Sequence, residues 1–265
     1  MPGERNAVCD FSGGTRVIGY RKEGWQIMFP YSVSTAAVED PLTYLPRKPV
    51  QEFTRRRVIY DAQQPTGCLY LVVLGRVTVR LNSEDGCQTI ARIVCAEGIF
   101  GESALIGSVG RQESAVALDD VTVMAWSREE IEAQIEREPR LGLALAQYLV
   151  RQCLELQDRI ESLAVHKTPE RIMLALAQLA VSMGTALPDD ATRIPAITHH
   201  TLAEYVGTSR EIVTFQLNRL RRKGCLRYTR KYIDVFVPAI DAELLSQGVH
   251  PPPRPSISHV RKAAE

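Results

Sequence analysis

The sequence lacks the features that would place the chain in a membrane or outside the cell. No run of residues approaches the ~18 consecutive apolar residues of a membrane-spanning helix. Glu4, Arg5 and Asp10 stand where a secretory signal peptide would have an apolar core. The six cysteines form no Cys-x-x-Cys pair, and a chain of 265 residues does not need disulfides to fold. We therefore expect a cytoplasmic protein with reduced cysteines and no membrane partner.

The common motifs of enzymes and metal sites are also missing. The sequence contains no P-loop, no His-Glu-x-x-His and no Cys/His spacing typical of zinc. Residues 101–105, GESAL, begin like the nucleophile turn of a serine hydrolase but lack its closing glycine. We therefore predict no catalytic residue, no metal ligand and no enzyme activity.

A net charge of only +1 hides two opposite local excesses. Residues 97–139 contain ten acidic and three basic residues, a net charge of −7. Residues 205–231 contain eight basic residues and one acidic residue, a net charge of +7. A compact basic block in a neutral protein is typical of a surface that binds nucleic acid. Charge alone leaves open a second interpretation, in which the block is a solvated helix face.

The middle of the chain has the pattern of a β domain. The length and the 45% hydrophobic content are those of a globular protein with two domains. Residues 56–127 contain short apolar runs separated by Gly or Asp: VIY, CLYLVVLGRVTVRL, QTIARIV, SAVAL and VTVMAW. Turns are expected at residues 82–86 and 96–98. This pattern predicts an antiparallel sandwich or roll, whereas residues 1–44 have no sustained period and receive no fold assignment.

Two helices are expected to follow the strands. Ser127 and Glu130 have the spacing of a capping box, which predicts a helix start at residue 128. After Pro139 a longer helix is expected to reach about Val165. It carries an apolar seam at heptad spacing, formed by Leu149, Cys153, Leu156, Ile160 and Leu163. We expect this seam to face a second copy of the chain, and packing within its own domain is the alternative.

The basic block lies in a helix-turn-helix pattern. Pro169 opens a helix that Gly184 and Pro188 end. Residues 198–206 and a helix capped by Ser209 then flank a short turn at Gly207. The inward face would consist of Leu202, Val206, Val213, Leu217 and Leu220. The stretches CLRYT and YIDVFV are expected to form a two-stranded wing, and the proline-rich end of the chain is expected to be disordered.

Three stretches together carry a family resemblance. They are LYLVVLGRVTV with the turn at Gly86, GIFGESAL at residues 98–105, and LAEYVGTSREIVTFQLNRLRRKG. In this order they resemble the Crp/Fnr superfamily of bacterial transcription regulators over residues 56–237, and acidobacterial members look especially similar around YVGTSREIV and LRYTRK. The resemblance implies an α+β chain with an antiparallel β-roll, a long dimerisation helix and a C-terminal winged helix-turn-helix.

The resemblance also implies a domain division and a set of partners. The expected segments are an N-terminal extension at 1–44, a cyclic-nucleotide-binding-like sensor at 45–138, a dimerisation helix at 139–166, a winged helix-turn-helix at 167–248 and a disordered tail at 249–265. The expected partners are double-stranded DNA, a second copy of the chain and RNA polymerase. A receptor whose helix-turn-helix serves protein interaction only is the alternative, and the basic block argues against it.

In the family, the second helix of the motif enters the major groove and its first residues contact bases. Here these residues are Ser209, Arg210 and Glu211. An arginine fork bonds guanine O6 and N7, and a carboxylate accepts a hydrogen bond from cytosine N4. Phe215 replaces another base-reading arginine and can touch a thymine methyl, so the operator is expected to differ from the cAMP-receptor site. The expected phosphate contacts are Thr208, Thr214, Asn218, Arg219, Arg227, Arg230 and Lys231.

The expected effector pocket departs from the family pattern. Cyclic-nucleotide members bind ribose through the Glu of a Phe-Gly-Glu stretch, which corresponds to Glu102 between Gly101 and Ser103. They bind the phosphate through an Arg-Ser or Arg-Thr pair. Here Glu113 directly precedes Ser114, and a carboxylate at that place repels a phosphate.

Two further positions bear on the effector. Arg111 lies three residues before Ser114 and reaches the phosphate only if a longer loop brings it back. The adenine-contacting hydroxyls of the long helix correspond to Leu156 and Gln157. We therefore expect an effector other than cAMP or cGMP, or none, in which case the regulator is controlled by its abundance.

The sequence has few of the residues that would bind the family's other effectors. An iron-sulfur sensor needs clustered N-terminal cysteines, and only Cys9 precedes residue 68. Haem bound through histidine is disfavoured because all five histidines lie at or beyond residue 166, and a cysteine ligand is the alternative that stays open. A thiol switch through Cys153 of the seam remains a hypothesis beside its interpretation as a small apolar residue.

Overall fold

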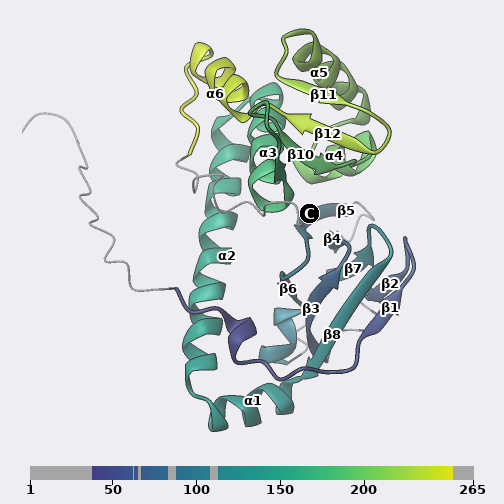
Figure 1. Cartoon of the computed structure of the whole chain (residues 1–265), viewed down its shortest axis with the longest axis vertical. Helices are drawn as coiled ribbons and strands as arrows, with labels where there is room; N and C mark the ends of the chain where they lie inside the picture. Colours follow the sequence, from purple (N-terminus) through teal and green to yellow (C-terminus); the bar gives the residue numbers. More distant parts are fainter. Residues whose placement is uncertain (1–37, 62, 65–66, 83–87, 108–112, 253–265) are drawn as a thin grey trace, which may run out of the picture. The chain divides into compact units, whose positions relative to one another are not determined.

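The computed structural model describes residues 38–252, except for residues 62, 65–66, 83–87 and 108–112 (Figure 1). These residues belong to one compact unit that begins at Val38. The predicted turn at 82–86 and most of the predicted disordered tail lie outside the described residues. The α+β class is confirmed, with an antiparallel β-rich part followed by helices and a helix-turn-helix.

Two four-stranded antiparallel sheets form the β-roll, in the orders β1-β8-β3-β6 and β2-β7-β4-β5. The strands are β1 (Gln51–Phe53), β2 (Val58–Tyr60), β3 (Cys68–Leu74), β4 (Val77–Asn82), β5 (Gln88–Val94), β6 (Ile99–Phe100), β7 (Glu113–Ala117) and β8 (Val121–Ser127). Every apolar run predicted to be extended contains a strand, and the longest, CLYLVVLGRVTVRL, contains two, β3 and β4. Strands β1 and β6 were not predicted, because β1 (QEF) is mostly polar and β6 (IF) has only two residues.

Alternating side chains fill the space between the two sheets. Val72 of β3, Val79 of β4 and Val123 of β8 are buried in one cluster, as period-two alternation requires. Tyr70 stacks on Phe100 with ring centroids 5.0 Å apart. The turn predicted at 96–98 is present, although its left-handed residue is Glu97 rather than the glycine.

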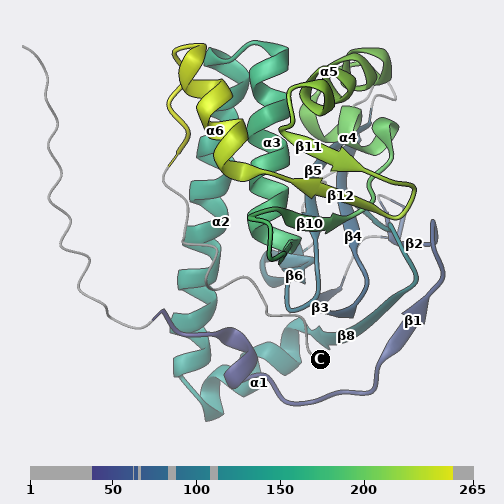
Figure 2. The same cartoon turned by 45° about the horizontal axis from the view of Figure 1, so that its top comes forward.

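The long helix packs buried apolar residues against the roll along its first half. Helix α1 (Arg128–Arg137) begins with the predicted capping box of Ser127 and Glu130. It leads into α2 (Arg140–Val165), which runs from α1 past the roll in both views (Figure 1, Figure 2). Leu141, Leu145 and Tyr148 of α2 pack against the roll core, whereas the later seam residues of α2 are exposed.

The C-terminal module consists of four helices and a small antiparallel sheet. The elements are α3 (Thr168–Met183), β9 (Thr185–Ala186), β10 (Thr192–Pro195), α4 (His199–Val206), α5 (Arg210–Arg222), β11 (Leu226–Tyr228), β12 (Tyr232–Val235) and α6 (Val237–Ser246). The wing hairpin β11–β12 is present as predicted. The prediction of two strands was incomplete, because β12 also pairs with β10, and β10 with β9.

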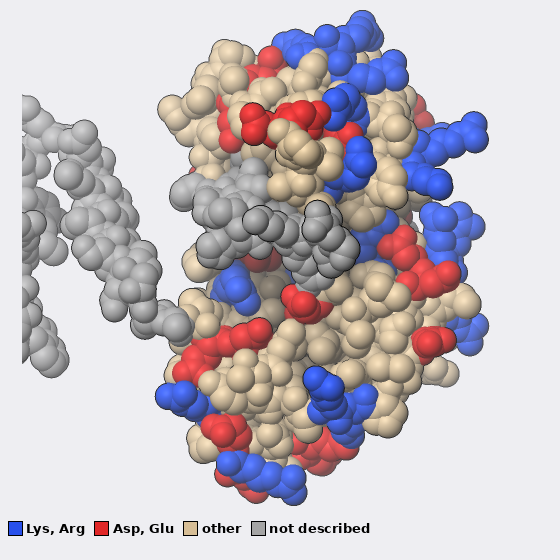
Figure 3. All heavy atoms as spheres, in the orientation of Figure 1, with Lys and Arg blue, Asp and Glu red and all other residues tan. Residues whose placement is uncertain are grey.

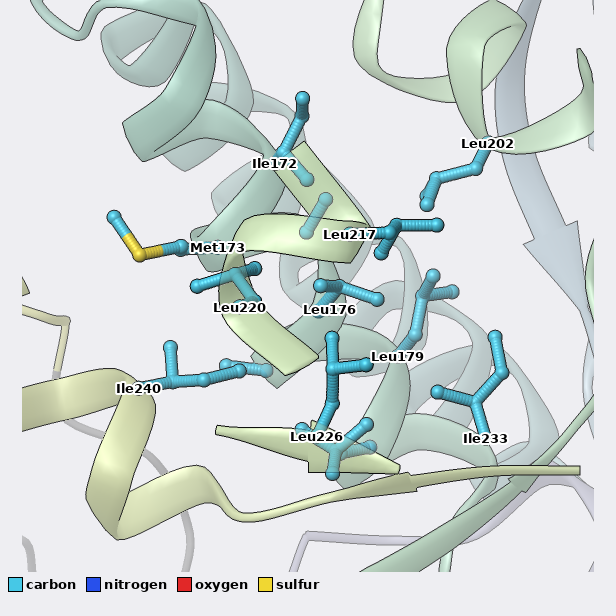
Figure 4. Packing of buried hydrophobic residues seen from close by; sticks show 14 of the residues in the cluster. Ile172, Met173, Leu176, Leu179, Leu202, Leu217, Leu220, Leu226, Ile233 and Ile240 are labelled. Atoms are coloured by element: carbon cyan, nitrogen blue, oxygen red, sulfur yellow. The ribbon is translucent and has the colours of Figure 1, made fainter. Parts of the chain in front are cut away.

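A single apolar cluster holds this module together. Figure 4 shows Leu176 of α3, Leu217 of α5 and Leu226 of β11 converging on one core. The predicted inward face of the helix-turn-helix is buried in full: Leu202, Val206, Val213, Leu217 and Leu220. None of the helices formed by the described residues combines the length and the apolar character that a bilayer crossing requires.

Candidate nucleic-acid interface and sensor site

The start of α5 is fixed by its caps and is exposed. The Ser209 hydroxyl accepts a hydrogen bond from the Ile212 amide at 3.3 Å, which caps the helix as predicted. Gly207 ends α4 in the left-handed conformation, with φ of 74°, and so permits the tight turn between the two helices. Ser209, Arg210 and Glu211 are all exposed, so the three predicted base-reading positions lie together on the surface.

Apolar residues also lie on the outer face of α5. Phe215 is 65% exposed and Ile212 is 43% exposed, although both are large apolar side chains. Val213 and Leu217 point into the core, so Phe215 is directed away from it. The sequence analysis selected Phe215 through the family resemblance and did not select Ile212. Ile212 comes directly before Val213, which was predicted to face the core, and successive helix residues point in different directions. This position in the helix could have shown that Ile212 faces outward.

Two of the side chains predicted to contact phosphates form hydrogen bonds with other residues of the chain. The Thr214 hydroxyl donates to the Arg210 carbonyl at 2.8 Å and lies 2.8 Å from His199 Nδ1. The Asn218 side-chain oxygen accepts from the Tyr228 hydroxyl at 3.1 Å. These contacts tie α5 to α4 and to the wing. Thr214 and Asn218 therefore stabilise the module, whatever else they bind.

The predicted basic contacts divide into paired and more open side chains. Arg227 lies 2.7 Å from Asp189 and 3.4 Å from Asp234. Arg219 is 3.8 Å from a carboxylate of α6. Arg230 and Lys231 are exposed on the wing, and Thr208 is half-buried in the turn before α5. In Figure 3 lysines and arginines gather at the upper right, where Figure 1 places α5 and the wing.

Glu102 has an internal partner in the sensor. It lies in the short 3-10 helix η2 (Glu102–Ile106), after Gly101 with φ of 81°. Arg92 of β5 donates to both Glu102 carboxylate oxygens, at 2.7 and 2.9 Å, and to the Gln152 side chain of α2 at 2.5 Å. Burial is the largest single influence and lowers the pKa of Arg92, but Glu102 and Tyr148 together raise it by more, so the arginine stays charged. We call this set of three side chains the Arg92 clamp.

Arg92 and Gln152 were not among the residues predicted for the effector pocket. The family resemblance directed attention to Glu102 and to the Arg-Ser pair, neither of which predicts a cation on β5. A polar residue in the strand run QTIARIV reads as one more solvent-facing position. Only the pairing of β5 with β4 and the position of α2 bring these side chains to Glu102.

The other residues predicted for the effector pocket do not belong to the Arg92 clamp. Ser114 is buried on β7, with its hydroxyl oxygen 3.4 Å from the Asn82 amide nitrogen, and Ser103 is half-buried. Leu156 and Gln157 are exposed on α2. Arg111 lies outside the described residues. Each of these roles stays a prediction.

Glu113, which precedes Ser114, also has an internal partner. Its carboxylate accepts a hydrogen bond from the Tyr60 hydroxyl at 2.5 Å. Burial, followed by the charge of Glu113, raises the pKa of Tyr60 above its ordinary value. The tyrosine therefore keeps its proton at neutral pH and donates it in the hydrogen bond to Glu113.

The seam predicted on α2 forms an exposed apolar stripe. Leu149, Leu156, Leu163 and Cys153 are exposed, and Ile160 is 66% exposed. Large apolar side chains in such a row are unusual on a helix that faces water alone.

Arginines also join the sensor strands to the C-terminal module. Arg159 of α2 donates to the backbone carbonyls of Ile90 and Ala91 in β5 and to that of Tyr205 in α4. Its guanidinium carbon lies 4.8 Å from the centre of the Tyr205 ring. Nothing in the sequence pattern distinguished Arg159 from a surface arginine, because its acceptors are backbone carbonyls.

A second link comes from the turn between β3 and β4. Buried Arg76 pairs with Asp119 at 2.6 Å and donates to the carbonyls of Pro195 and Ala196, at 3.3 and 3.1 Å. The sensor strands and the helix-turn-helix are thus connected by two arginines from different elements.

Two family models match the chain. A cyclic nucleotide-binding domain covers residues 50–138, and a Crp-like helix-turn-helix domain covers residues 170–241. The chain is 30% identical over 176 residues to the Cyclic AMP receptor protein of Thermus thermophilus, covering 66% of this chain and 78% of that protein. It is 32% identical over 163 residues to the Transcriptional regulator SdrP of the same organism, covering 62% and 76%.

One solved structure has a similar fold. It is a transcriptional regulator of the CRP/FNR family, also from Thermus thermophilus, 29% identical, with a TM-score of 0.60. The match covers 75% of this chain and 98% of that one. The sequence similarity and the similarity of fold therefore extend across both the sensor and the C-terminal module.

Proposed function

Because the chain belongs to the Crp/Fnr family of transcription regulators, we propose that it binds a near-palindromic operator in double-stranded DNA as a homodimer. The observation that carries this proposal is the exposed Ser209-Arg210-Glu211 at the capped start of α5. Exposed polar groups at the start of the second helix of such a motif are placed to reach base edges. We propose no catalytic activity for the chain.

Within this proposal α5 supplies the base contacts and the wing supplies the phosphate contacts. Arg210 reads guanine, Glu211 reads cytosine, and Phe215 contacts a thymine methyl. Arg230 and Lys231, exposed on the wing, bind phosphates and so fix the register of the protein on the duplex. Ile212 adds apolar area beside Phe215.

The exposed seam supports the homodimer. Leu149, Cys153, Leu156, Ile160 and Leu163 repeat every four and three residues, as in paired parallel helices. Pairing α2 with its copy would bury this stripe and bring two α5 helices to one side of a duplex. The seam also brings two copies of Cys153 together, which is the basis of the thiol-switch hypothesis.

The remaining expectations are family inferences. We propose that the bound dimer contacts RNA polymerase, acts in the cytoplasm and resembles acidobacterial members of the family. The domain boundaries given by the sequence, with the sensor at 45–138 and the DNA-binding domain at 167–248, stay proposals.

Selection of bound fragments from random genomic DNA, with a salt titration of the best site, tests the proposed function. We expect one palindromic site, and an affinity that falls steeply as salt rises, because phosphate contacts release counterions. No enriched site and a salt slope near zero would contradict DNA binding and favour a receptor whose helix-turn-helix contacts proteins.

Sedimentation equilibrium tests the dimer separately. Ile160→Glu places a charge in the seam and is expected to shift the wild-type dimer to monomer. Leu154→Glu is the matched control, because Leu154 is a similarly exposed apolar residue of α2 outside the seam. A wild-type chain that remains monomeric at high concentration would rule the dimer out.

A further inference from the structure

We propose that Arg92 occupies the effector site of the sensor in place of a cyclic nucleotide, so that operator binding needs no such ligand. The family resemblance gives Glu102 the role of ribose acceptor, and in this structure both of its oxygens accept from Arg92. The inference rests on the proposed function only for its DNA readout, because occupancy of the site can be measured without DNA.

The Arg92 clamp connects two elements of the sensor to the long helix. Arg92 comes from β5, Glu102 from η2 and Gln152 from α2, so one guanidinium joins three elements, of which α2 is distant in sequence. Only 19% of each of the Arg92 and Glu102 side chains is exposed. A bidentate arginine–carboxylate pair with limited solvent access is among the stronger polar contacts in proteins.

A neutral ribose hydroxyl is a poor replacement for this partner. To reach Glu102 it would have to displace a guanidinium that makes two charge-assisted bonds, and the displaced cation would then need a new acceptor. At the other end, the carboxylate of Glu113 is bound to Tyr60 next to Ser114, and it would repel a phosphate. Both ends of the expected ligand therefore meet groups that oppose its binding.

The clamp also makes the connection between roll and long helix that a ligand would otherwise make. Tyr148, one turn before Gln152 on α2, donates to the Ile99 carbonyl at 2.8 Å and accepts from its amide at 3.2 Å. Just before Arg92 on β5, the carbonyls of Ile90 and Ala91 accept from Arg159 of α2. Strand β5 is thus held to α2 by side chains running in both directions.

The same strand reaches the helix-turn-helix. Ile93, next to Arg92 on β5, packs against the core of the C-terminal module. Arg159 donates to the Tyr205 carbonyl, at 2.7 Å, as well as to β5. The clamp therefore fixes the strand that contacts α4, and its loss is expected to weaken operator binding without touching the DNA-contacting residues.

Isothermal titration calorimetry with cAMP and with cGMP, using the wild-type full chain, is the first test. We expect no saturable heat at millimolar nucleotide. Operator affinity, measured by fluorescence anisotropy, should then change by less than about twofold with either nucleotide, since a ligand that does not bind cannot shift the equilibrium between two states of the protein. Saturable binding of either nucleotide would overturn the proposal, and a tenfold or greater rise in operator affinity would show in addition that the nucleotide is an effector.

Variants of the clamp are the second test. Arg92→Ala and Glu102→Ala should each lower operator affinity by about 5- to 150-fold, the range of allosteric coupling, and the double variant should lose no more than either single one. Arg128→Ala is the matched control, because its pair with Glu132 is exposed at one end of α1. Thermal melts establish that the variants compared are folded.

The outcomes separate this inference from the proposed function. Folded Arg92→Ala with wild-type operator affinity would overturn the role of the clamp. A wild-type chain that selects no operator would refute the proposed function. Calorimetry would still decide the occupancy of the site in that case, since nucleotide heat contradicts the inference and its absence supports it.

Discussion

Arg210 and Lys231 represent two kinds of DNA contact at the scale of the residue. Arg210 lies at the start of α5 and Lys231 on the wing, and both side chains are exposed. Arg210→Ala should cost about 1–3 kcal/mol on the selected operator and little on a scrambled duplex, because it removes a base contact. Lys231→Ala should weaken both complexes alike and lower the salt slope by about 1. Anisotropy titrations of both duplexes at several salt concentrations distinguish the two, and equal losses for Arg210→Ala on both would show that it contacts phosphate.

Gly75 shows how the roll depends on one backbone conformation. It joins β3 to β4 with φ of 84°, and a Cβ there would lie 2.3 Å from the Asp120 carbonyl oxygen. Gly75→Ala should therefore destabilise the protein by about 2 kcal/mol or more, seen as a lower urea midpoint. Gly67→Ala is the control, because a Cβ at Gly67 meets nothing within 4 Å. Equal midpoints for the two variants would mean that the turn relaxes without cost.

At the scale of the element, sequence reasoning succeeded where a pattern is local and long. The strands of five or more residues, the Ser127 and Ser209 caps and the buried face of the helix-turn-helix follow from alternation and capping chemistry. Strands β9 (TA) and β10 (TRIP) were not predicted because, unlike the equally short β11 and β12, they contain no apolar run. The Arg92 clamp and Arg159 were not predicted because their contacts join different elements, and no local pattern records such contacts.

The sheet of the C-terminal module contains a buried carboxylate that links pH to stability. Asp234 of β12 accepts from Arg193 of β10, at 2.7 and 3.0 Å, and from Arg227 of β11 at 3.4 Å. The hydrogen bond and charge of Arg193, with a smaller contribution from Arg227, lower the pKa of Asp234 despite its burial. The contribution of this carboxylate is therefore present above the unfolded pKa of about 4, and it is lost as pH falls through the lower folded value.

Asp234→Asn tests this linkage. The variant should be about 1–2 kcal/mol less stable than wild type at pH 7, because a neutral amide accepts weaker hydrogen bonds from the two arginines. The difference should shrink as the pH falls below about 4, where the carboxylate takes up its proton first in the unfolded chain, and it should vanish below the lower folded pKa. Urea midpoints measured from pH 7 down to acid check it. A difference that stays constant over this range would assign the effect to packing rather than to charge.

At the scale of the whole molecule, several contacts tie the sensor strands to the reading module. Arg76 donates to carbonyls before α4, Arg159 to the last turn of α4, and Arg80 lies 3.4 Å from Glu204. Polar contacts between two packed modules can be exchanged for others more readily than an apolar core can be repacked. The position of α5 is therefore set jointly by the strands and by α2, and pairing two chains through the seam would fix the distance between two α5 helices.

That distance gives the last prediction, which concerns the spacing of the operator's two halves. If two α5 helices read successive major grooves on one side of the duplex, the half-site centres lie about 34 Å apart, one helical turn of DNA. Inserting about 5 base pairs between the halves turns one of them to the opposite side of the duplex, and affinity should fall to that of a half-site alone. A symmetric duplex with the selected spacing and a single half-site are the controls in anisotropy titrations. If the insertion is tolerated, each chain reads DNA independently, and the exposed seam of α2 must then serve another partner.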